Sequence, residues 1–306
     1  MKRTDLIAAF FLLSLALIII NEQQNFFTML IKSFAFQIMC IIFLLSIYWI
    51  WKSRWHLSLA AFCSLLLIDS ILPPLYSRDS VRAPSSNSFS IAHFNVLISN
   101  TEYESTIAAA INSKADFISF NEVTQAWADS LDRGLSGIYS YSKVVPNDES
   151  SFGIAVYSKY PLSDLKILCI EDIPNITGRI KLTDTSLYFI TSHTKSPISN
   201  KNYKIRNRHI HAIANHLKTI EGPVVAAGDY NIVPWDSVIN TFKKKAALVD
   251  SRQSLTPTYP AYLKIAQIPI DYIFHSDELD CLSFSTISGT SSDHLGIIGC
   301  YQFKNL

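Results

Sequence analysis

The pattern of apolar and polar positions changes near residue 85 of this 306-residue chain. Before that point, apolar residues form three long runs, at Leu6–Ile20, Ser33–Trp51 and Trp55–Tyr76. Beyond it, short stretches rich in β-branched and aromatic residues alternate with stretches whose apolar residues recur every three to four positions. The first kind predicts strands and the second predicts helices. The chain therefore combines an apolar N-terminal region with an α/β domain.

The three apolar runs predict three transmembrane helices within residues 1–76. Ser33–Trp51 is 19 residues long and uncharged, which is enough to cross a bilayer. The first run follows a basic start, but the polar sequence NEQQ stands where a signal peptide would have small residues for cleavage. Asp69 lies near the end of the third run, where it can reach the membrane interface. We therefore expect a multi-pass membrane protein that contacts the bilayer directly.

Basic residues beside the runs predict the orientation. Lys2 and Arg3 precede the first run, and Lys52 and Arg54 lie between the second and third. Such flanks favour the cytoplasmic side of a membrane, so three crossings would place the rest of the chain outside the cytoplasm. Lys32, Arg78 and Arg82 on the opposite side weaken this asymmetry.

Charge and cysteine content exclude several classes of protein. Residues 1–84 carry 7 Lys and Arg against 4 Asp and Glu, and residues 85–306 carry 19 against 21. The domain is therefore slightly acidic, which argues against a strong non-specific grip on nucleic acid. Its three cysteines cannot form a full disulfide framework, and no CxxC pair predicts a zinc site.

The order of the predicted elements defines the domain organisation. Residues 77–88 form a linker that overlaps the Pro- and Ser-rich stretch at 82–90, and residues 89–306 form the globular domain. Long β runs are mixed with αβ units, a combination that favours two packed sheets flanked by helices over a single parallel sheet.

Polar residues of the metal-binding or acid–base kind recur at six predicted strand ends. In layered α/β folds such ends gather at one edge of a sheet, where sites form. The stretch GDYN alone would be an ordinary turn, since Gly, Asp and Asn favour turns; six strand ends together indicate a site. The candidates are Asn95, Glu122, His193, Asp229, Asn231, Asp271, Asp293 and His294.

These side chains suit the hydrolysis of phosphate esters. Carboxylate and amide oxygens without thiolates favour a hard cation such as Mg²⁺ or Mn²⁺. Such a cation neutralises charge on phosphoryl oxygens, while the remaining aspartates and histidines can transfer protons or orient water.

Six short motifs, FNV, FNEV, TSHT, GDYN, IDYIF and SSDHLG in that order, resemble the endonuclease/exonuclease/phosphatase superfamily. The resemblance covers nearly all of residues 89–306, and TPTYP at 256–260 is similar to the membrane-anchored bacterial branch. It implies a four-layer α/β sandwich and a Mg²⁺-dependent phosphoesterase. One departure is Asn121, where many members have Gln before the metal-binding glutamate.

The resemblance also implies a role for each candidate. Glu122 would be the main metal ligand, with Asn95 and Asp293 beside it. Asp229 would orient or deprotonate the attacking water, and Asn231 would hold the phosphate. His294 would stabilise phosphoryl oxygens or exchange a proton, and Asp271 would orient His294. His193 would act on the leaving-group side.

Alternatives remain for the substrate and for the basic helix predicted at 201–219. A nuclease-type phosphodiesterase stands slightly ahead of a phospholipid-directed enzyme, and a non-catalytic, membrane-anchored binding module is a third possibility. The basic helix could grip a phosphate-rich substrate, but such a charge run is more often a solvated face. No obligate protein partner is evident from the sequence.

Overall fold

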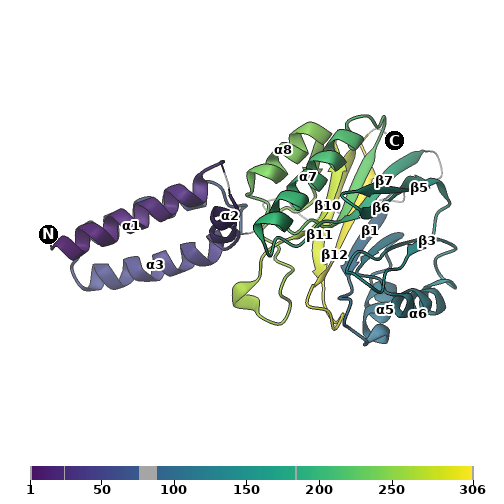
Figure 1. Ribbon diagram of the computed structural model, residues 1–306, viewed down its shortest axis with the longest axis horizontal. Helices are drawn as coiled ribbons and strands as arrows, with labels where there is room; N and C mark the ends of the chain where they lie inside the picture. Colours follow the sequence, from purple (N-terminus) through teal and green to yellow (C-terminus); the bar gives the residue numbers. More distant parts are fainter. Residues whose placement is uncertain (1, 24, 76–87, 183–184, 305–306) are drawn as a thin grey trace.

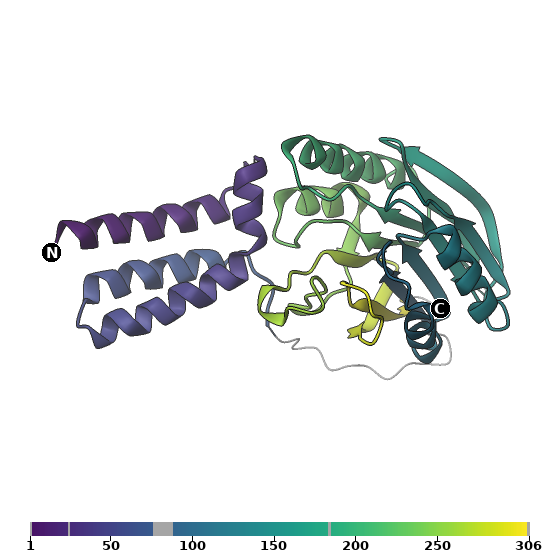
Figure 2. The same ribbon diagram turned by 60° about the horizontal axis from the view of Figure 1, so that its bottom comes forward.

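The computed structural model describes residues 2–23, 25–75, 88–182 and 185–304 (Figure 1). A helical bundle formed by the N-terminal residues extends from one side of an α/β domain (Figures 1 and 2). The predicted linker 77–88 lies outside the described residues apart from Ser88.

The described residues of the bundle form four helices: α1 (Arg3–Ile20), α2 (Phe26–Ser33), α3 (Ala35–Trp51) and α4 (Trp55–Asp69). Helix α4 packs against α1 and α3. At the end of the bundle away from the domain, Asp5 accepts hydrogen bonds from Arg54 (2.8 Å) and His56 (3.0 Å). The two basic segments singled out in the sequence therefore lie at the same end of the bundle.

The helices differ in length from the predicted spans. Within the described part of the chain, α1 is the one helix long and apolar enough by itself to cross a membrane, and 22% of it is buried. Helices α2 and α3 pass the same test only as a pair bent by 62°, and α4 has 15 residues. The finding supports one apolar N-terminal helix, rather than three straight spans at the predicted boundaries.

Local chemistry explains both differences. The predicted run Ser33–Trp51 is interrupted at Phe34, where the Ser33 hydroxyl donates to the Met29 carbonyl oxygen (2.9 Å), a bond that bends helices. The run Trp55–Tyr76 is helical only to Asp69, because Pro73 and Pro74 lack the amide protons that a continuing helix would need.

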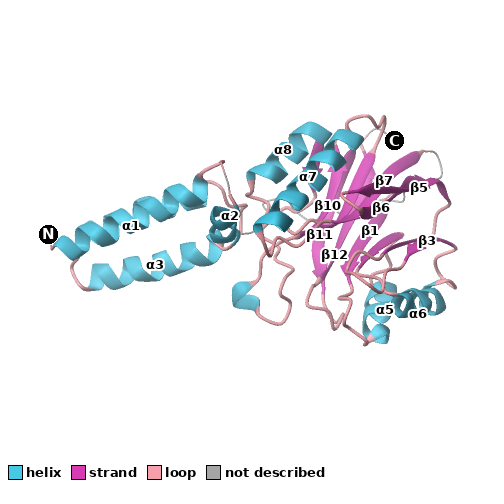
Figure 3. Cartoon of the chain, in the orientation of Figure 1, coloured by secondary structure: helices cyan, strands magenta, loops and turns pink. Residues whose placement is uncertain are grey.

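The domain contains two six-stranded mixed sheets (Figure 3). The first has the order β11-β12-β1-β2-β4-β3, and the second has the order β5-β6-β7-β8-β10-β9. The strands are β1 (Phe89–Asn95), β2 (Phe117–Asn121), β3 (Tyr141–Val145), β4 (Ile154–Ser158), β5 (Leu162–Ile170), β6 (Ile173–Lys181), β7 (Ser186–His193), β8 (Val224–Asp229), β9 (Leu248–Asp250), β10 (Asp271–Ser276), β11 (Leu279–Ile287) and β12 (Gly296–Phe303).

Helices cover the outer face of each sheet. One core joins the first sheet to α5 (Tyr103–Asn112) and α6 (Gln125–Leu135), and another joins the second sheet to α7 (Asn200–Leu217) and α8 (Ser237–Ala246). A third core lies between the sheets. The layers therefore run helix, sheet, sheet, helix, which confirms the predicted four-layer sandwich. Burial of apolar surface in these three cores is the main stabilising contribution to the domain.

Strand direction brings the polar strand ends together. β1 runs parallel to β2, and β7 runs parallel to β8, with His193 directly opposite Asp229. β10 runs antiparallel to β8, so its first residue, Asp271, also faces Asp229. The C-terminal ends of β1, β2, β7 and β8 and the start of β10 therefore lie at one edge of the sandwich.

Loops of the domain join the bundle through hydrogen bonds. Trp235 Nε1 donates to the carbonyl oxygen of Lys32 (2.7 Å), and Gln37 Nε2 donates to that of Gln267 (2.8 Å). The Ser237 hydroxyl donates to the Glu22 carbonyl oxygen (2.9 Å). The bundle is thus docked on the domain as well as linked to it.

Candidate active site

The backbone at the end of β8 positions Asp229. Gly228 has φ 149°, and a Cβ there would lie 1.9 Å from the Ser192 carbonyl oxygen of the neighbouring strand. Only glycine fits this close approach. The buried Asn121 side chain then accepts a hydrogen bond from the Asp229 amide (3.0 Å). Asn121, the departure from the family pattern, therefore supports the backbone of a candidate site residue.

Asp229, Asp271 and His294 form a buried chain of charges. His294 Nδ1 donates to Asp271 Oδ2 (2.8 Å), which orients the imidazole so that its Nε2 lies 3.7 Å from Asp229 Oδ2. All three side chains are buried. At 3.7 Å the Nε2 and the Asp229 carboxylate are close enough to attract each other but do not form a hydrogen bond, so both can turn to a ligand.

The surroundings shift the pKa values of these groups in opposite directions. Burial raises the pKa of the Asp229 carboxyl to about 6, and the negative charge of Asp271 acts in the same sense. Burial opposes protonation of His294, but Asp271, with Asp229 and Asp293, raises its pKa to about 10. His294 is therefore a cation at neutral pH, whereas Asp229 can accept a proton near neutral pH.

His93 is a further buried member of this cluster. Its Nε2 lies 3.7 Å from Asp271 Oδ1, on the side of the carboxylate away from His294, and its Nδ1 is bonded to the Ser119 hydroxyl (2.9 Å). Burial opposes ionisation of Asp271, but His294 and His93 hold the pKa of its carboxyl well below its usual range. The two histidines thus keep Asp271 ionised.

Glu122 follows β2 and is linked to Asp229 through Asn95. Its Oε1 accepts from Asn95 Nδ2 (3.0 Å), and its Oε2 accepts from the Ile98 amide (2.9 Å). Asn95 Nδ2 also lies 3.3 Å from Asp229 Oδ2, so this amide joins the two carboxylates. Glu122 has φ 66°, an uncommon conformation that aims its side chain across the strand ends.

Asp293 contributes a second acid beside Glu122. Among the described residues, no group donates to its buried Oδ1. Burial raises the pKa of Asp293 even though the charge of His294 opposes this, and the charge of Glu122 adds to the rise. A buried carboxylate oxygen without a donor, under the negative charge of a second acid, is the environment that a bound cation would stabilise.

A hard cation fits Glu122 and Asp293 better than the neighbouring acids. The oxygens of Asp229 and Asp271 and a ring nitrogen of His294 also lie within 4.8 Å of one another. Asp271 and His294 already satisfy each other, however, and a protonated imidazole has no lone pair for a metal. Glu122 and Asp293 offer carboxylate oxygens of the kind that Mg²⁺ or Mn²⁺ prefers. Asn95 turns its Nδ2 to the carboxylates, and its Oδ1 accepts from the Leu97 amide (3.0 Å), so it orients Glu122 in this arrangement.

His193 approaches Glu122 and Asp229 from the end of β7. Its Nδ1 donates to the Ser151 carbonyl oxygen (2.8 Å). Its Nε2 lies 3.6 Å from Asp229 Oδ2 and 3.9 Å from Glu122 Oε1. The ring is fixed by its backbone partner and presents Nε2 to the same space as the carboxylates.

Asn231 is arranged differently from the sequence expectation. An extended chain would place Asn231 and Asp229 on one face, but Asn231 has φ 51°, and its amide donates to Asp229 Oδ1 (2.8 Å). Its side chain donates to the Thr194 carbonyl oxygen (3.0 Å). Tyr230 is fully buried, as expected, and its ring packs against aromatic side chains of α8 and β10. The GDYN stretch is thus both a turn and part of the site.

All eight candidates from the sequence therefore lie at one sandwich edge. The sequence analysis missed two residues that complete it, His93 and Tyr259, whose ring centroid is 4.8 Å from that of His294. Strand alternation could have found His93, because residues two apart on β1 share a face and Asn95 was already a candidate. Tyr259 lies in an irregular loop, where no periodicity indicates side-chain direction.

The basic helix of the sequence is α7, and four of its polar side chains are paired with other groups of the protein. Arg206 is fully buried and donates to the Asn231 carbonyl oxygen (2.9 Å), while Arg208 pairs with Glu171. His209 is bonded to Asn175 Oδ1 (3.0 Å), and His216 to the Tyr188 hydroxyl (2.7 Å). These four side chains are structural, so α7 offers a weaker substrate grip than its sequence suggests.

Comparison with known proteins agrees with this fold and site. The sequence profile of the Endonuclease/Exonuclease/phosphatase family matches residues 92–294, a segment that contains all eight candidates. The chain belongs to this family. No curated protein sequence matches it significantly.

Solved structures with the same fold have low sequence identity. The D. rerio TDP2 structure complexed with a single-strand DNA product has 17% identity and a TM-score of 0.60, covering 71% of this chain and 100% of that one. The human Nocturnin catalytic domain with a bound sulfate anion has 15% identity and a TM-score of 0.58, covering 71% and 94%. Beta toxin from Staphylococcus aureus has 18% identity and a TM-score of 0.54, covering 69% and 99%. At these identities the likeness shows the fold.

Proposed function

We propose that this protein is a membrane-anchored, metal-dependent phosphodiesterase. The observation that carries the proposal is the convergence of four side chains at one edge of the sandwich: Glu122, Asp293, Asp229 and His294. Among the described residues, Asp293 Oδ1 accepts no hydrogen bond, and the imidazole of the next residue, His294, is a cation. This combination suits a phosphoryl group, which needs positive charge around its oxygens and a base for the attacking water.

Each residue has a distinct role in the proposed reaction. The Asp229 carboxylate accepts a proton from water or orients it for attack. The His294 imidazolium donates to a phosphoryl oxygen, and Asp271 fixes the ring that does so. His193 directs Nε2 to the leaving-group side. The Asn231 side chain, released from the Thr194 carbonyl, would contact the phosphate.

Glu122 and Asp293 would hold the cation, Mg²⁺ or Mn²⁺, and Asn95 would position Glu122. When bound, the cation would neutralise charge on the phosphoryl oxygens. The Ile98 amide and the Asn95 side chain fix both oxygens of Glu122 independently of the cation. The ligand set is therefore organised by the fold before the substrate arrives.

An exposed apolar loop favours a phospholipid as the substrate. Tyr262 and Ile265 are 78% and 81% exposed in the loop that follows Tyr259. The loop is tied to the site through the Ala261 amide, which donates to the Asp293 carbonyl oxygen (2.7 Å), and to the bundle through Gln37. Exposed apolar side chains that connect a polar site with an apolar helical bundle suit a substrate at a bilayer surface.

Nucleic acid is the second candidate substrate. The breadth of the family argues in its favour, but the exposed apolar loop places the phospholipid ahead. The D. rerio neighbour was solved with a single-strand DNA product. In this chain, Lys195 lies 4.7 Å from the ring centroid of Phe152, and that ring also contacts His193. An aromatic ring beside a lysine is the pairing that stacks a base and binds a phosphate. Because Arg206 and Arg208 of α7 are paired with other groups of the protein, α7 adds less basic surface for binding a nucleic acid.

A substrate panel tests the proposal. Purified full-length protein is assayed with plasmid DNA, sphingomyelin and phosphoinositides, each with Mg²⁺ and with EDTA. We expect hydrolysis of a phospholipid that requires the metal, whereas cleavage of DNA alone would assign the second candidate. No hydrolysis of any substrate by folded protein would favour a non-catalytic binding module.

We also propose that the bundle enters the membrane and leaves the domain outside the cytoplasm. Large apolar side chains are exposed on every helix of the bundle, including Phe10, Phe43 and Phe62, as in membrane-embedded helices. Both basic segments lie at the end away from the domain. A reporter that is active only outside the cytoplasm, fused after Leu306, should be active. A well-expressed but inactive fusion would reverse the orientation.

A further inference from the structure

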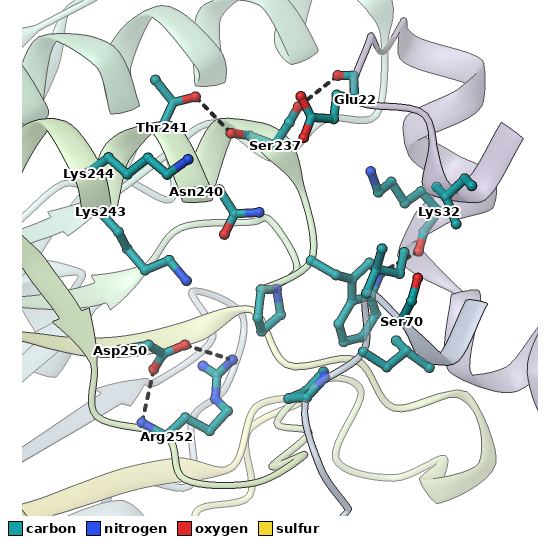
Figure 4. A pocket seen from close by; sticks show the side chains of 16 residues that line it. Glu22, Lys32, Ser70, Ser237, Asn240, Thr241, Lys243, Lys244, Asp250 and Arg252 are labelled. Atoms are coloured by element: carbon teal, nitrogen blue, oxygen red, sulfur yellow. Dashed lines mark hydrogen bonds and ion pairs between the residues drawn. The ribbon is translucent and has the colours of Figure 1, made fainter. Parts of the chain in front are cut away.

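A second polar cavity lies between the bundle and the domain (Figure 4). Its volume is about 480 Å³, and α8 forms one wall. The residues after α1 and the segment Ser70–Pro73 after α4 form the opposite wall. None of the eight candidate active-site residues lines it, so this cavity is separate from the catalytic edge.

The cavity is rich in positive charge. Lys243 and Lys244 of α8 point toward it, and Lys32 faces them from the bundle (Figure 4). Lys32 already donates to the Asn21 carbonyl oxygen (3.2 Å). Two acids, Glu22 and Asp250, also line the cavity, but they are outnumbered by the cations there. An anionic ligand complements this wall.

Arg252 completes the cationic wall and has unused donors. Its side chain is 2% exposed and lies over the Tyr272 ring, 4.3 Å from the centroid. One guanidinium nitrogen donates to the Asp271 carbonyl oxygen (2.6 Å). Within the described part of the chain, Nε and Nη1 make no hydrogen bond, and Asp250 is 3.6 Å from Nη1. A buried guanidinium with free donors calls for an acceptor, and a phosphate offers several.

The position of the cavity indicates where that phosphate comes from. Its bundle wall consists of Lys32 of α2 and of residues at or just beyond the C-terminal ends of α1 and α4, at the end of the bundle that faces the domain. With the helices in a bilayer, this level corresponds to the lipid head groups. Trp235 lines the cavity at the same level and joins the two walls, because its Nε1 donates to the Lys32 carbonyl oxygen.

We propose that this cavity binds the phosphate of an anionic phospholipid and thereby fixes the domain against the membrane. Lys243, Lys244 and Arg252 supply the charge, and Asn240 lies beside them as a neutral hydrogen-bonding group. The proposal rests on the proposed insertion of the bundle, and it does not require the phosphodiesterase activity. It gives the lysines of α8 a role beyond stabilising the helix C-terminus.

A binding experiment in a catalytically disabled background tests this. Full-length Glu122→Gln protein in a neutral detergent is titrated with dihexanoyl phosphatidic acid, dihexanoyl phosphatidylcholine and inorganic phosphate. Tryptophan fluorescence gives the dissociation constant, and the melting temperature gives an independent readout. We expect saturable binding of phosphatidic acid that raises the melting temperature, and at least about tenfold weaker binding of the other two.

Matched variants locate the site. Lys243→Gln with Lys244→Gln should weaken phosphatidic acid binding by about tenfold or more. Lys201→Gln with Lys245→Gln removes the same charge from α7 and from the last turn of α8, and should change binding by less than about twofold. Lys243→Arg with Lys244→Arg should retain binding.

Three outcomes would overturn the proposal. Equal losses in the two glutamine pairs would mean that general surface charge attracts the lipid. Equal affinity for inorganic phosphate would assign a free anion instead of a lipid. Equal affinity for phosphatidylcholine would show that acyl chains, and not the anionic head group, carry the binding. Hydrolysis by the unsubstituted protein is measured separately, so that a failure of lipid binding at this cavity is distinguished from a failure of the phosphodiesterase proposal.

Discussion

The catalytic edge and the interior of α7 both contain buried histidines and charges, yet their contacts differ. At the edge, Asp293 Oδ1 has no donor among the described residues, and His294 Nε2 and Asp229 Oδ2 stand 3.7 Å apart. Along α7, the Arg206 guanidinium and the His216 ring are each held by a partner within hydrogen-bonding distance. The edge leaves charged groups for a ligand, whereas α7 uses its groups to join the helix to the sheet. Substitutions at the edge should therefore reduce turnover, and substitutions along α7 should reduce stability.

Glu122→Gln should give the largest effect on turnover. The amide keeps the shape of the side chain but removes a charge from the proposed cation site. We expect activity to fall by on the order of 1,000-fold with little change in melting temperature, and to recover partly at high Mg²⁺. Glu104→Gln, at an exposed position on α5, is the control and should be silent. Unsubstituted enzyme that remains active after complete chelation would refute the metal hypothesis.

Exchanging the two polar groups of GDYN tests the edge more finely. Asp229→Asn removes the proposed base, and Asn231→Asp places a negative charge where the phosphate would bind. Each should lower turnover by about 100-fold or more. Tyr230→Phe should be nearly silent, because the ring only packs. Near-normal rates in both exchanged variants, with unchanged melting temperature, would show that the stretch is simply a turn.

Much of the edge could be predicted from the sequence because strand ends bear a simple relation to sheet topology. Asn95, Glu122, His193 and Asp229 each follow an apolar stretch, and parallel pairing brings such ends together. The Asn231 conformation could not be predicted in this way. It depends on a left-handed residue and on the Asp229 carboxylate accepting its amide, which are details of one turn.

The helix interior was harder to predict for a different reason. Arg206 and Arg208 are two apart in a basic sequence, and nothing in that sequence indicates that one is buried and the other exposed. Their difference arises from how α7 packs against β8 and from the Asn231 carbonyl oxygen that Arg206 reaches. The apolar N-terminal runs could be predicted from the sequence, but the ends of the helices could not. Those ends depend on the hydrogen bond from the Ser33 hydroxyl to the Met29 carbonyl oxygen and on the two prolines after α4.

These two arginines therefore provide a stability test with an internal control. Arg206→Met removes a buried donor from the Asn231 carbonyl oxygen and from the Asn207 side chain, and should destabilise the domain by about 3 kcal/mol. Arg208→Met breaks only an exposed pair with Glu171 and should cost less than about 1 kcal/mol. Denaturant unfolding in detergent measures both. Equal, small changes would mean that the α7 interior contributes little to stability.

The smallest expected effect is the pH dependence contributed by His209. Burial lowers the pKa of this imidazole to about 4, while the unfolded chain has the ordinary value near 6.5. Because the unfolded state binds the proton more readily, the neutral ring stabilises the fold fully above pH 6.5. This contribution is lost as the pH falls toward 4, by up to about 1.4 kcal/mol per pH unit.

His209→Gln should remove that part of the pH dependence, because the glutamine amide can still donate to Asn175 Oδ1 but does not titrate in this range. The melting temperature of the variant should therefore fall less steeply than that of the unsubstituted protein between pH 6.5 and 4. His211→Gln, at a half-buried position two residues along the same helix, serves as the control and should leave the slope nearly unchanged. Parallel slopes for His209→Gln and the unsubstituted protein would mean that His209 is solvated in the native state. The α7 interior would then be open to water, as the catalytic edge must be to admit its substrate.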